Sequence, residues 1–272
     1  MAMQLSVILM ALAGTLSADS FMIRYESDML KMVNRDRARH RLPALEIDDR
    51  LTQVARGHSK DMAVHGFFGH KSPNSGAPAD RYHKARIASA RLTENVALHQ
   101  SVSAAQKRLM ESPGHRKNLL DPKVTHIGIG IYRRRRDLYI TQNFLLPLKE
   151  VNISSAPEEF LMKVNELRKK KGRRPLVLDK RIVEVCEANS QIMHKKDDLG
   201  GDVAQRGMRR LKKYFRGYAM YFNFAKELDP LMGAGALMDK DMHSLGLGVV
   251  VNENKDSGYG MLWVTLVVAK KK

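Results

Sequence analysis

The sequence of 272 residues predicts an α+β fold, arranged as two tandem copies of an α-β-α sandwich. Residues 21–65 show the apolar spacing of amphipathic helices. Residues 127–144 hold two short apolar segments around a charged turn, which is typical of a β-hairpin. Much of the pattern of residues 29–62 recurs at residues 160–193. Helices that precede strands favour a sandwich over a doubly wound sheet.

Two helices are predicted near the N-terminus and a third further along the chain. Residues 21–41 end in a basic turn, where the helix dipole favours cations, and Pro43 follows. Residues 49–65 give the clearest helix, because apolar or neutral positions recur on one side. That stripe consists of Leu51, Ala55, His58 and Met62. Ser101 is a suitable N-cap for a helix that runs to Met110.

Two strands and an internal repeat complete the pattern. Residues 127–132 and 138–144 read as strands joined at residues 133–137, a turn with four arginines. The repeat keeps identical residues at many positions, which are Leu30, Val33, Asn34, Arg37, Leu45, Asp48, Arg50, Val54, Ser59 and Met62 in the first copy. The IGIG segment from Ile127 matches the LGLG segment from Leu245. The repeat therefore predicts two tandem copies of one domain, of which the second is shorter in its middle.

Composition narrows the classes of protein and partner. A hydrophobic fraction of 43% and a charged fraction of 28% exclude collagen, a coiled coil and a polytopic membrane protein. The single Cys186 excludes a disulfide framework within the chain and a cysteine-based zinc site. A net charge of +18 favours anionic lipid or an acidic polymer, with nucleic acid the less expected partner. Residues 168–174 (RKKKGRR) fit either an anion-binding patch or a helix end that runs into a basic loop.

The predicted organisation has four parts. Residues 1–20 hold an apolar run followed by small residues, which predicts a signal peptide; the alternative is a buried or disordered extension of an intracellular protein. Residues 21–148 form the first domain. Residues 149–157 are rich in small and polar residues and are predicted to be a linker. Residues 158–272 form the second domain.

Five segments of the first copy carry a family resemblance. In order, they are FFGHKSP with His70, TENVA with Glu94, SPGHRKNLL with His115, then THIGIG and TQNF. This ordered set resembles the CAP superfamily, the SCP domain of cysteine-rich secretory proteins, antigen 5 and plant pathogenesis-related proteins of group 1. The scarcity of cysteine and the SPGHR segment resemble its bacterial-type branch. The resemblance covers about residues 26–146 and implies an α-β-α sandwich.

The resemblance also implies a cleft lined by two histidines and two acidic residues, which can hold a divalent metal. His70 and His115 match the two histidines, and Glu94 matches the first acid. The position of the second acid falls at Ser112, so the adjacent Glu111 is the candidate for completing the tetrad. The implied cofactor is Zn²⁺ or another divalent cation held by His70 and His115.

Elementary chemistry points to the same three residues. Two neutral imidazoles and a carboxylate are a recurrent zinc set that leaves a position for water. Glu94 could then act as the general base of a hydrolase. From spacing alone, however, three unrelated surface residues are the simpler interpretation, because His70, Glu94 and His115 are far apart in the sequence.

The second copy lacks this set of residues. His70 aligns with about Gly201, and the segments that align with Glu94 and His115, residues 217–222 and 231–236, hold no acid and no histidine. The second copy is therefore predicted to be a degenerate CAP-like domain.

Three functions follow from these observations, in order of preference. The first is a secreted binding protein for a lipid, sterol, peptide or protein, as the resemblance implies. The second is a charge-driven binder of an anionic polymer or membrane. The third is a zinc-dependent hydrolase that uses His70, His115 and Glu94; because the family offers no shared reaction, an enzyme is less favoured than a binding protein.

Overall fold

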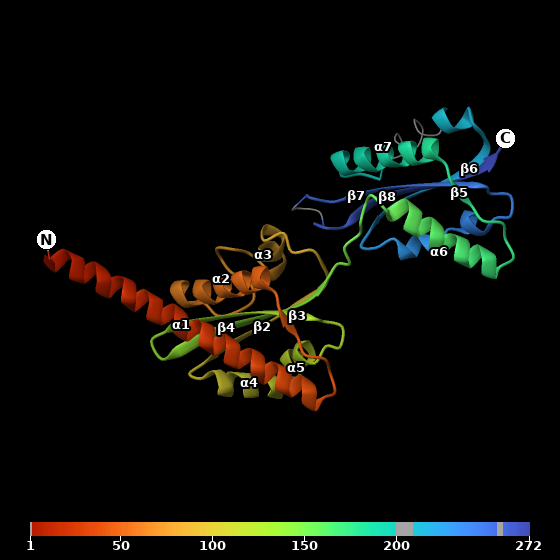
Figure 1. The fold of residues 1–272 in the computed structure, drawn as a ribbon. Coiled ribbons are helices and arrows are strands. Elements are labelled where there is room, and N and C mark those ends of the chain that lie inside the picture. Colours follow the sequence, from red (N-terminus) through yellow and green to blue (C-terminus); the bar gives the residue numbers. More distant parts are fainter. Residues whose placement is uncertain (1, 200–208, 255–257) are drawn as a thin grey trace. The chain divides into compact units, whose positions relative to one another are not determined.

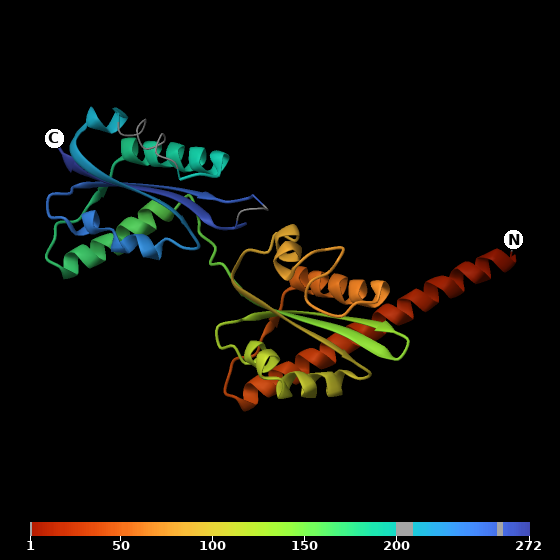
Figure 2. The same ribbon diagram turned by 180° about the vertical axis from the view of Figure 1, so that it is seen from behind.

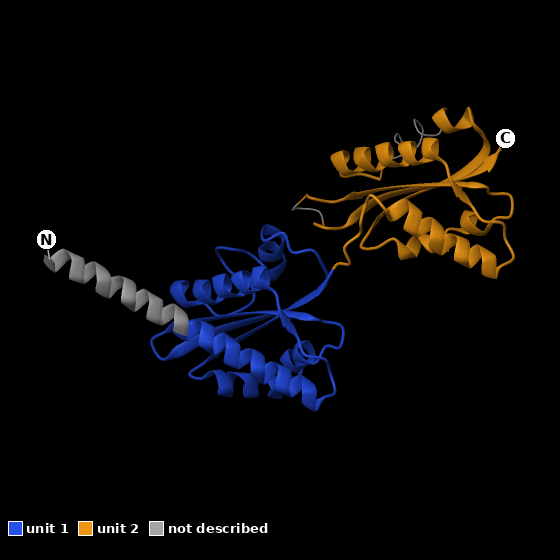
Figure 3. Cartoon of the chain, viewed as in Figure 1, with its two compact units in different colours: residues 1–147 blue, residues 148–272 orange. Residues whose placement is uncertain are grey.

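The computed structural model describes residues 2–199, 209–254 and 258–272, with side chains from Phe21 onward. The chain divides into two compact units, residues 1–147 and residues 148–272 (Figure 3). Each unit has its own sheet and its own hydrophobic clusters. The two units are therefore described separately.

The first unit is an α-β-α sandwich, which confirms the predicted fold class. Its helices are α1 (Ala2–Arg39), α2 (Asp49–His65), α3 (Pro78–Lys84), α4 (Val102–Glu111) and α5 (Pro113–Leu119). Its strands are β1 (Glu46–Ile47), β2 (Ser89–His99), β3 (His126–Arg134) and β4 (Asp137–Pro147), in the sheet order β1-β3-β4-β2. Helices α2 and α3 cover one face of the sheet, and α1, α4 and α5 cover the other (Figures 1 and 2).

Helix α2 shows how local sequence and packing agree. Asp48 accepts a hydrogen bond from the Leu51 amide at 2.8 Å and caps the helix, while Gly66 ends it in the left-handed conformation at φ 70°. The buried side of α2 lies directly on β3. A Cβ at Gly128 or Gly130 would overlap the α2 backbone, so the IGIG pattern allows helix and strand to approach this closely.

The other predicted elements of the first unit are confirmed with small shifts. Ser101 accepts a hydrogen bond from the Ala104 amide at 3.3 Å and caps α4 as predicted. The predicted strands form the antiparallel β3–β4 hairpin, and the arginines at its tip are exposed. The helix predicted at residues 21–41 is the exception: it begins at Ala2 and ends at Arg39, and Arg41 then takes a positive φ of 58°.

The second unit repeats the arrangement in the residues that the structure describes, where residues 209–212 are also helical. It contains α6 (Ala156–Lys170), β5 (Val177–Leu178), α7 (Lys180–Lys196), β6 (Phe215–Ala225), β7 (Ser244–Val251) and β8 (Leu262–Lys271). Its sheet order, β5-β7-β8-β6, corresponds strand for strand to that of the first unit. Two short 3₁₀ turns, η1 (Asp229–Gly233) and η2 (Gly235–Met238), lie where the first unit has α4 and α5. Because α6 begins at Ala156, the last two residues of the predicted linker belong to a helix.

In the described part of each unit, a fully buried arginine ties loops together. Arg37 donates to the carbonyl oxygens of Leu119 and Asp121 at 2.9 and 3.0 Å. Arg168 donates to those of Leu237 and Asp239 in the same way. Arg168, the first residue of the RKKKGRR segment, is therefore a structural residue and not part of an anion-binding patch.

Candidate functional site

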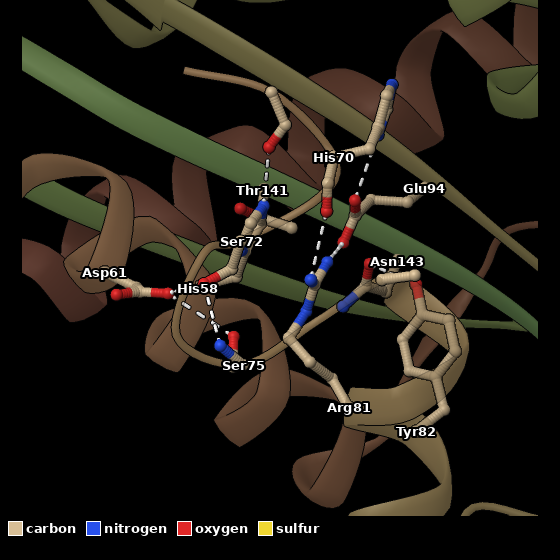
Figure 4. Close-up of polar contacts among 12 residues, drawn as sticks. His58, Asp61, His70, Ser72, Ser75, Arg81, Tyr82, Glu94, Thr141 and Asn143 are labelled. Atoms are coloured by element: carbon tan, nitrogen blue, oxygen red, sulfur yellow. Dashed lines mark hydrogen bonds and ion pairs between the residues drawn. The ribbon is translucent and has the colours of Figure 1, made fainter. Parts of the chain in front are cut away.

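The structure brings His70 and Glu94 into contact. His70 lies in the loop between α2 and α3, and its Nδ1 is 3.0 Å from Oε1 of Glu94 on β2 (Figure 4). The His70 side chain is half exposed, whereas the Glu94 side chain is 2% exposed. The two residues that the sequence places far apart thus share one polar cluster.

Arg81 on α3 is the partner that the sequence analysis missed. Its Nη2 donates to Oε2 of Glu94 at 2.6 Å, and its Nη1 donates to the carbonyl oxygens of His70 and Gly76 at 3.0 Å each (Figure 4). The Arg81 side chain is only 6% exposed. Both carboxylate oxygens of Glu94 are therefore engaged, and a buried guanidinium compensates its charge.

The loop that carries His70 is held by Asp61 of α2. Asp61 accepts hydrogen bonds from the Ser72 hydroxyl, from Nδ2 of Asn74 at 2.9 Å and from the Ser75 hydroxyl at 3.3 Å. Burial alone would raise the pKa of Asp61, but these hydrogen bonds and His65 lower it below its ordinary value. Asp61 therefore stays ionised and fixes the loop.

His58 lies beneath the same loop and is 1% exposed. Its Nε2 is 2.9 Å from the carbonyl oxygen of Gly69, so Nε2 carries the hydrogen and donates. Burial lowers the pKa of His58, and the nearby charge of Arg81 lowers it further. His58 is thus a neutral, buried residue, in agreement with its place on the apolar stripe of α2.

We expect His58 to make stability depend on pH. Because its pKa in the folded state is below the ordinary 6.5, the unfolded chain binds the proton first as the pH falls. The free energy of unfolding should therefore be highest above pH 6.5 and should decrease below it. In the variant His58→Gln, which keeps an amide donor for Gly69, the slope should be smaller by up to about 1.4 kcal/mol per pH unit. Urea denaturation at several pH values checks this; an unchanged slope contradicts it.

His115 lies near His70, but it belongs to a helix, whereas His70 lies in a loop. His115 belongs to α5, and its backbone carbonyl oxygen accepts a hydrogen bond from Nδ2 of Asn95 at 3.2 Å. Burial lowers the pKa of His115, and the charge of His70 lowers it further. His70, Glu94 and His115 are therefore gathered on one side of the first unit.

Glu111 is the last residue of α4, and its side chain is 50% exposed. Its carboxylate faces Lys107 at 4.0 Å and Arg108 at 3.6 Å. Glu111 and His115 line the same cavity. That Glu111 completes a tetrad stays a prediction.

The donor set does not fit a metal ion well. Glu94, the carboxylate in contact with His70, already turns one oxygen to His70 and the other to Arg81. Among the described residues, no three His, Cys, Asp or Glu side chains come together as metal ligands. Zinc at His70 and His115 therefore stays a prediction, and the geometry does not favour it.

Buried amides extend the polar cluster along β4. Tyr82 donates its hydroxyl to Oδ1 of Asn143 at 2.9 Å, and burial raises its pKa. Gln142 accepts from Asn95 at 3.2 Å. From the sequence, Gln142 and Asn143 could either face a cleft or have a structural role. In the structure both are fully buried and hydrogen-bonded to other residues of the unit.

A cavity of about 480 Å³ adjoins His115. Its lining is apolar and polar in nearly equal parts; it includes Phe68, Val96, Leu98, His99, Arg108, Leu109, Glu111 and His115. Phe68 and Leu98 are 52% and 41% exposed, so the cavity opens to solvent past two apolar side chains. Such a volume is within the usual range for small-molecule sites.

The second unit has apolar residues at the positions of Glu94 and Asn143. The matching glycines Gly128 and Gly246 pair with Asn143 and Val267. Glu94 lies opposite Asn143, and Met220 lies opposite Val267, so Met220 corresponds to Glu94. Gly201, which aligns with His70, lies outside the described residues.

In the part of the chain that the structure describes, no helix is long and apolar enough to span a bilayer. Residues 1–20, the predicted signal peptide, precede the described side chains.

Comparisons with known proteins agree with the motifs of the first unit. "Uncharacterized protein YkwD" of Bacillus subtilis is 38% identical over 117 residues, which are 43% of this chain and 46% of that protein. "Uncharacterized membrane protein YlbC" of the same species is 36% identical over 121 residues, which are 44% of this chain and 34% of that protein. The chain thus spans less than half the length of these relatives.

Among solved structures, an extracellular protein containing a SCP domain from Bacillus anthracis is 35% identical, with a TM-score of 0.45. That match covers 47% of this chain and 42% of the other. The sequence model of CAP, the cysteine-rich secretory protein family, matches residues 30–144, the range that holds His70, Glu94 and His115. Residues 30–144 of this chain therefore form a CAP domain and belong to the cysteine-rich secretory protein family.

Proposed function

We propose that the CAP unit is a secreted binding module, not an enzyme, and that it holds a ligand with an apolar body in the cavity beside His115. Secretion is inferred from the signal-like composition of residues 1–20. The observation that carries the proposal is the state of Glu94, whose oxygens are 3.0 Å from His70 Nδ1 and 2.6 Å from Arg81 Nη2. A general base must face its substrate, whereas the Glu94 carboxylate is 2% exposed and turns one oxygen to His70 and the other to Arg81.

The cavity itself supports an amphipathic ligand. Val96 and Leu109 form apolar walls, and Phe68 and Leu98 stand at the opening. The polar part of the lining holds Arg108, whose Nη1 is 3.6 Å from Glu111, together with the imidazoles of His99 and His115. A fatty acid combines an apolar chain with an anionic end and is the ligand class that fits this distribution.

The test is a titration of the full chain with cis-parinaric acid, a fluorescent fatty acid. The double variant Phe68→Ser, Leu98→Ser should bind at least about tenfold more weakly, because two exposed apolar contacts are lost. Ile153→Ser is the matched control, since Ile153 is also a 45% exposed apolar residue but lies in the second unit. Equal binding by the double variant and the wild type would reject the cavity as the site.

The charge-driven alternative is supported by the exposed arginines at the β3–β4 turn, residues 133–136, and by the net charge of +18. It differs from the cavity proposal in its response to salt. Binding through charge weakens steeply as salt rises, whereas binding in an apolar cavity persists. The same titration at low and high salt therefore separates the two functions. The zinc-hydrolase alternative is the least supported, because Arg81 already compensates Glu94.

We also propose that the second unit is a degenerate copy of the CAP unit. The sheet order, the pairing of β5 with β7 and the buried arginine all have counterparts in the first unit. Met220 in place of Glu94 removes the acid around which the polar cluster of the first unit is built. This unit is proposed to serve a structural or binding role without a polar cleft.

A further inference from the structure

A further cavity of the first unit, of about 390 Å³, lies beside α5. Helix α5 and the residue after it contribute Pro113, Arg116, Lys117 and Leu120 to its lining. The spacing of these four residues places them on one face of the helix. Ser112 and His115 lie on another face and line the cavity described above, so the two cavities are distinct. We call the cavity of about 390 Å³ the basic pocket.

Positive charge dominates the basic pocket. Three of its lining residues are cations, namely Arg91, Arg116 and Lys117, and one, Asp121, is an acid. Arg116 and Lys117, which we call the α5 cations, are exposed, and neither forms an ion pair within the described part of the chain. The lining therefore carries an excess of two positive charges.

Arg91 on β2 is held in position at the wall of the basic pocket. Its Nε donates to Oδ2 of Asp121, whose side chain is 7% exposed. Asp121 is fixed in turn, because its Oδ1 accepts a hydrogen bond from the Lys123 amide at 2.9 Å. Among the described residues, nothing accepts a hydrogen bond from the two Nη groups of Arg91. A guanidinium that the fold already positions loses less conformational entropy when it binds an anion.

The second unit has no cations at the positions of the α5 cations. Asp239 corresponds to Asp121, since the carbonyl oxygen of each accepts a hydrogen bond from the buried arginine of its unit. The same arginines bond the residue two positions earlier, so the spacing is equal in both units. Counted back from Asp239, the equivalents of the α5 cations are Ala234 and Gly235.

Arg91 has no cationic counterpart either. It follows the register shift in β2, and Gly217 follows the equivalent shift in β6. The ion pair of Asp239 is made instead by Lys270 of β8 at 3.3 Å. The second unit thus forms the same sheet without the three cations, so packing does not account for them in the first unit.

We propose that the basic pocket binds the phosphate group of a small phosphate monoester. A phosphate monoester carries close to two negative charges at neutral pH, which equals the excess charge of the lining. Arg91 and Arg116 offer paired N–H donors that match phosphate oxygens, and Lys117 adds a point charge. The remaining lining residues give apolar surface for the body of the ester; they are Pro113, Leu120 and Pro122.

The size of the basic pocket favours a small soluble molecule. About 390 Å³ is near the lower end of the range for ligand sites, enough for one phosphate group and a single ring. This inference does not depend on the fatty-acid site beside His115, because the two sites share no lining residue.

The experiment titrates the full chain with phenyl phosphate by calorimetry at neutral pH and low salt. We expect saturable binding at a single site. Phenyl sulfate is the matched control ligand, since it has a similar shape but one negative charge fewer, and it should bind more weakly. The absence of saturable binding, or equal binding of the two compounds, would overturn the proposal.

A double variant locates the site. Arg116→Ala, Lys117→Ala removes the α5 cations and should bind phenyl phosphate at least about tenfold more weakly. Both positions are exposed and helical, so the unit should stay folded. Lys169→Ala, Lys170→Ala removes two adjacent exposed cations from α6 and should bind as the wild type does. Equal weakening by the two double variants would assign the binding to overall charge and reject the pocket.

A last arm separates the sources of the phosphate group, because the headgroup of phosphatidic acid is also a phosphate monoester. The chain is mixed with vesicles that contain phosphatidic acid, and cosedimentation is measured. Phenyl phosphate should bind the chain without vesicles. If the chain binds only the vesicles, and the Arg116→Ala, Lys117→Ala variant does not, the partner is a membrane surface and the proposal of a small soluble ester is wrong.

Discussion

An Arg81→Met variant is expected to lower the free energy of unfolding of the CAP unit by about 3–5 kcal/mol. The reason is the position of Glu94, which is 2% exposed and would be left as a buried carboxylate without its cation. The variant also loses the hydrogen bonds to the carbonyl oxygens of His70 and Gly76. Calorimetry should show the melting temperature of this unit lowered by about 10 °C or more.

A second substitution should recover much of this loss. The second unit has Met220 where the first has Glu94, so a methionine is compatible with this position of the sheet. The double variant Arg81→Met, Glu94→Met should therefore be more stable than Arg81→Met alone. A double-mutant cycle in urea measures the coupling between the two residues. Additive effects would contradict the charge-pair interpretation, and the exposed Arg133→Met is the control, with an expected change within about 0.5 kcal/mol.

The elements that the sequence predicts well are those in which local rules and packing agree. Helix α2 begins after Asp48 and ends at Gly66, and both residues act as caps by local hydrogen bonding. Its apolar stripe then faces β3, whose two glycines allow the contact. The β3–β4 hairpin is equally local, because a charged turn joins two apolar strands.

The details of the candidate site were less predictable, because they depend on contacts between distant segments. Arg81 belongs to α3, a helix of 7 residues that is too short to show a hydrophobic period. In the sequence it resembles any other arginine of a basic chain, and only the fold places it against Glu94. A buried carboxylate needs a cation, but a sequence with 47 lysines and arginines does not say which one.

The position of the Glu111 side chain also depends on the fold, because it is set by the direction in which α4 presents that residue. Adjacent positions on a helix point in different directions, so the acid beside the expected position sits at the exposed end of α4. Residues 168–174 show the reverse of Glu111. In the sequence they form a basic run with no sign of burial, whereas the fold buries Arg168, the first residue of the run.

Replacement of the buried arginine of each unit by methionine is the second large effect that we expect. Arg37→Met removes the donor for the carbonyl oxygens of Pro43, Leu119 and Asp121, at 2.8, 2.9 and 3.0 Å, and leaves them buried without it. The loss should be about 4 kcal/mol, which corresponds to a melting temperature about 10–20 °C lower for that unit. Arg168→Met should have a similar effect on the second unit, because Arg168 donates to the carbonyl oxygens of Arg174, Leu237 and Asp239.

The two variants form a matched pair, since each arginine bonds only carbonyl oxygens of its own unit. Hydrogen exchange followed by mass spectrometry should therefore show lost protection in residues 21–147 for Arg37→Met and in residues 158–272 for Arg168→Met. An exposed neighbour in each helix, Arg39→Met or Lys169→Met, should leave protection unchanged. Loss of protection in both units from either variant would mean that the units unfold as one, which a chain with two separate buried cores should not do.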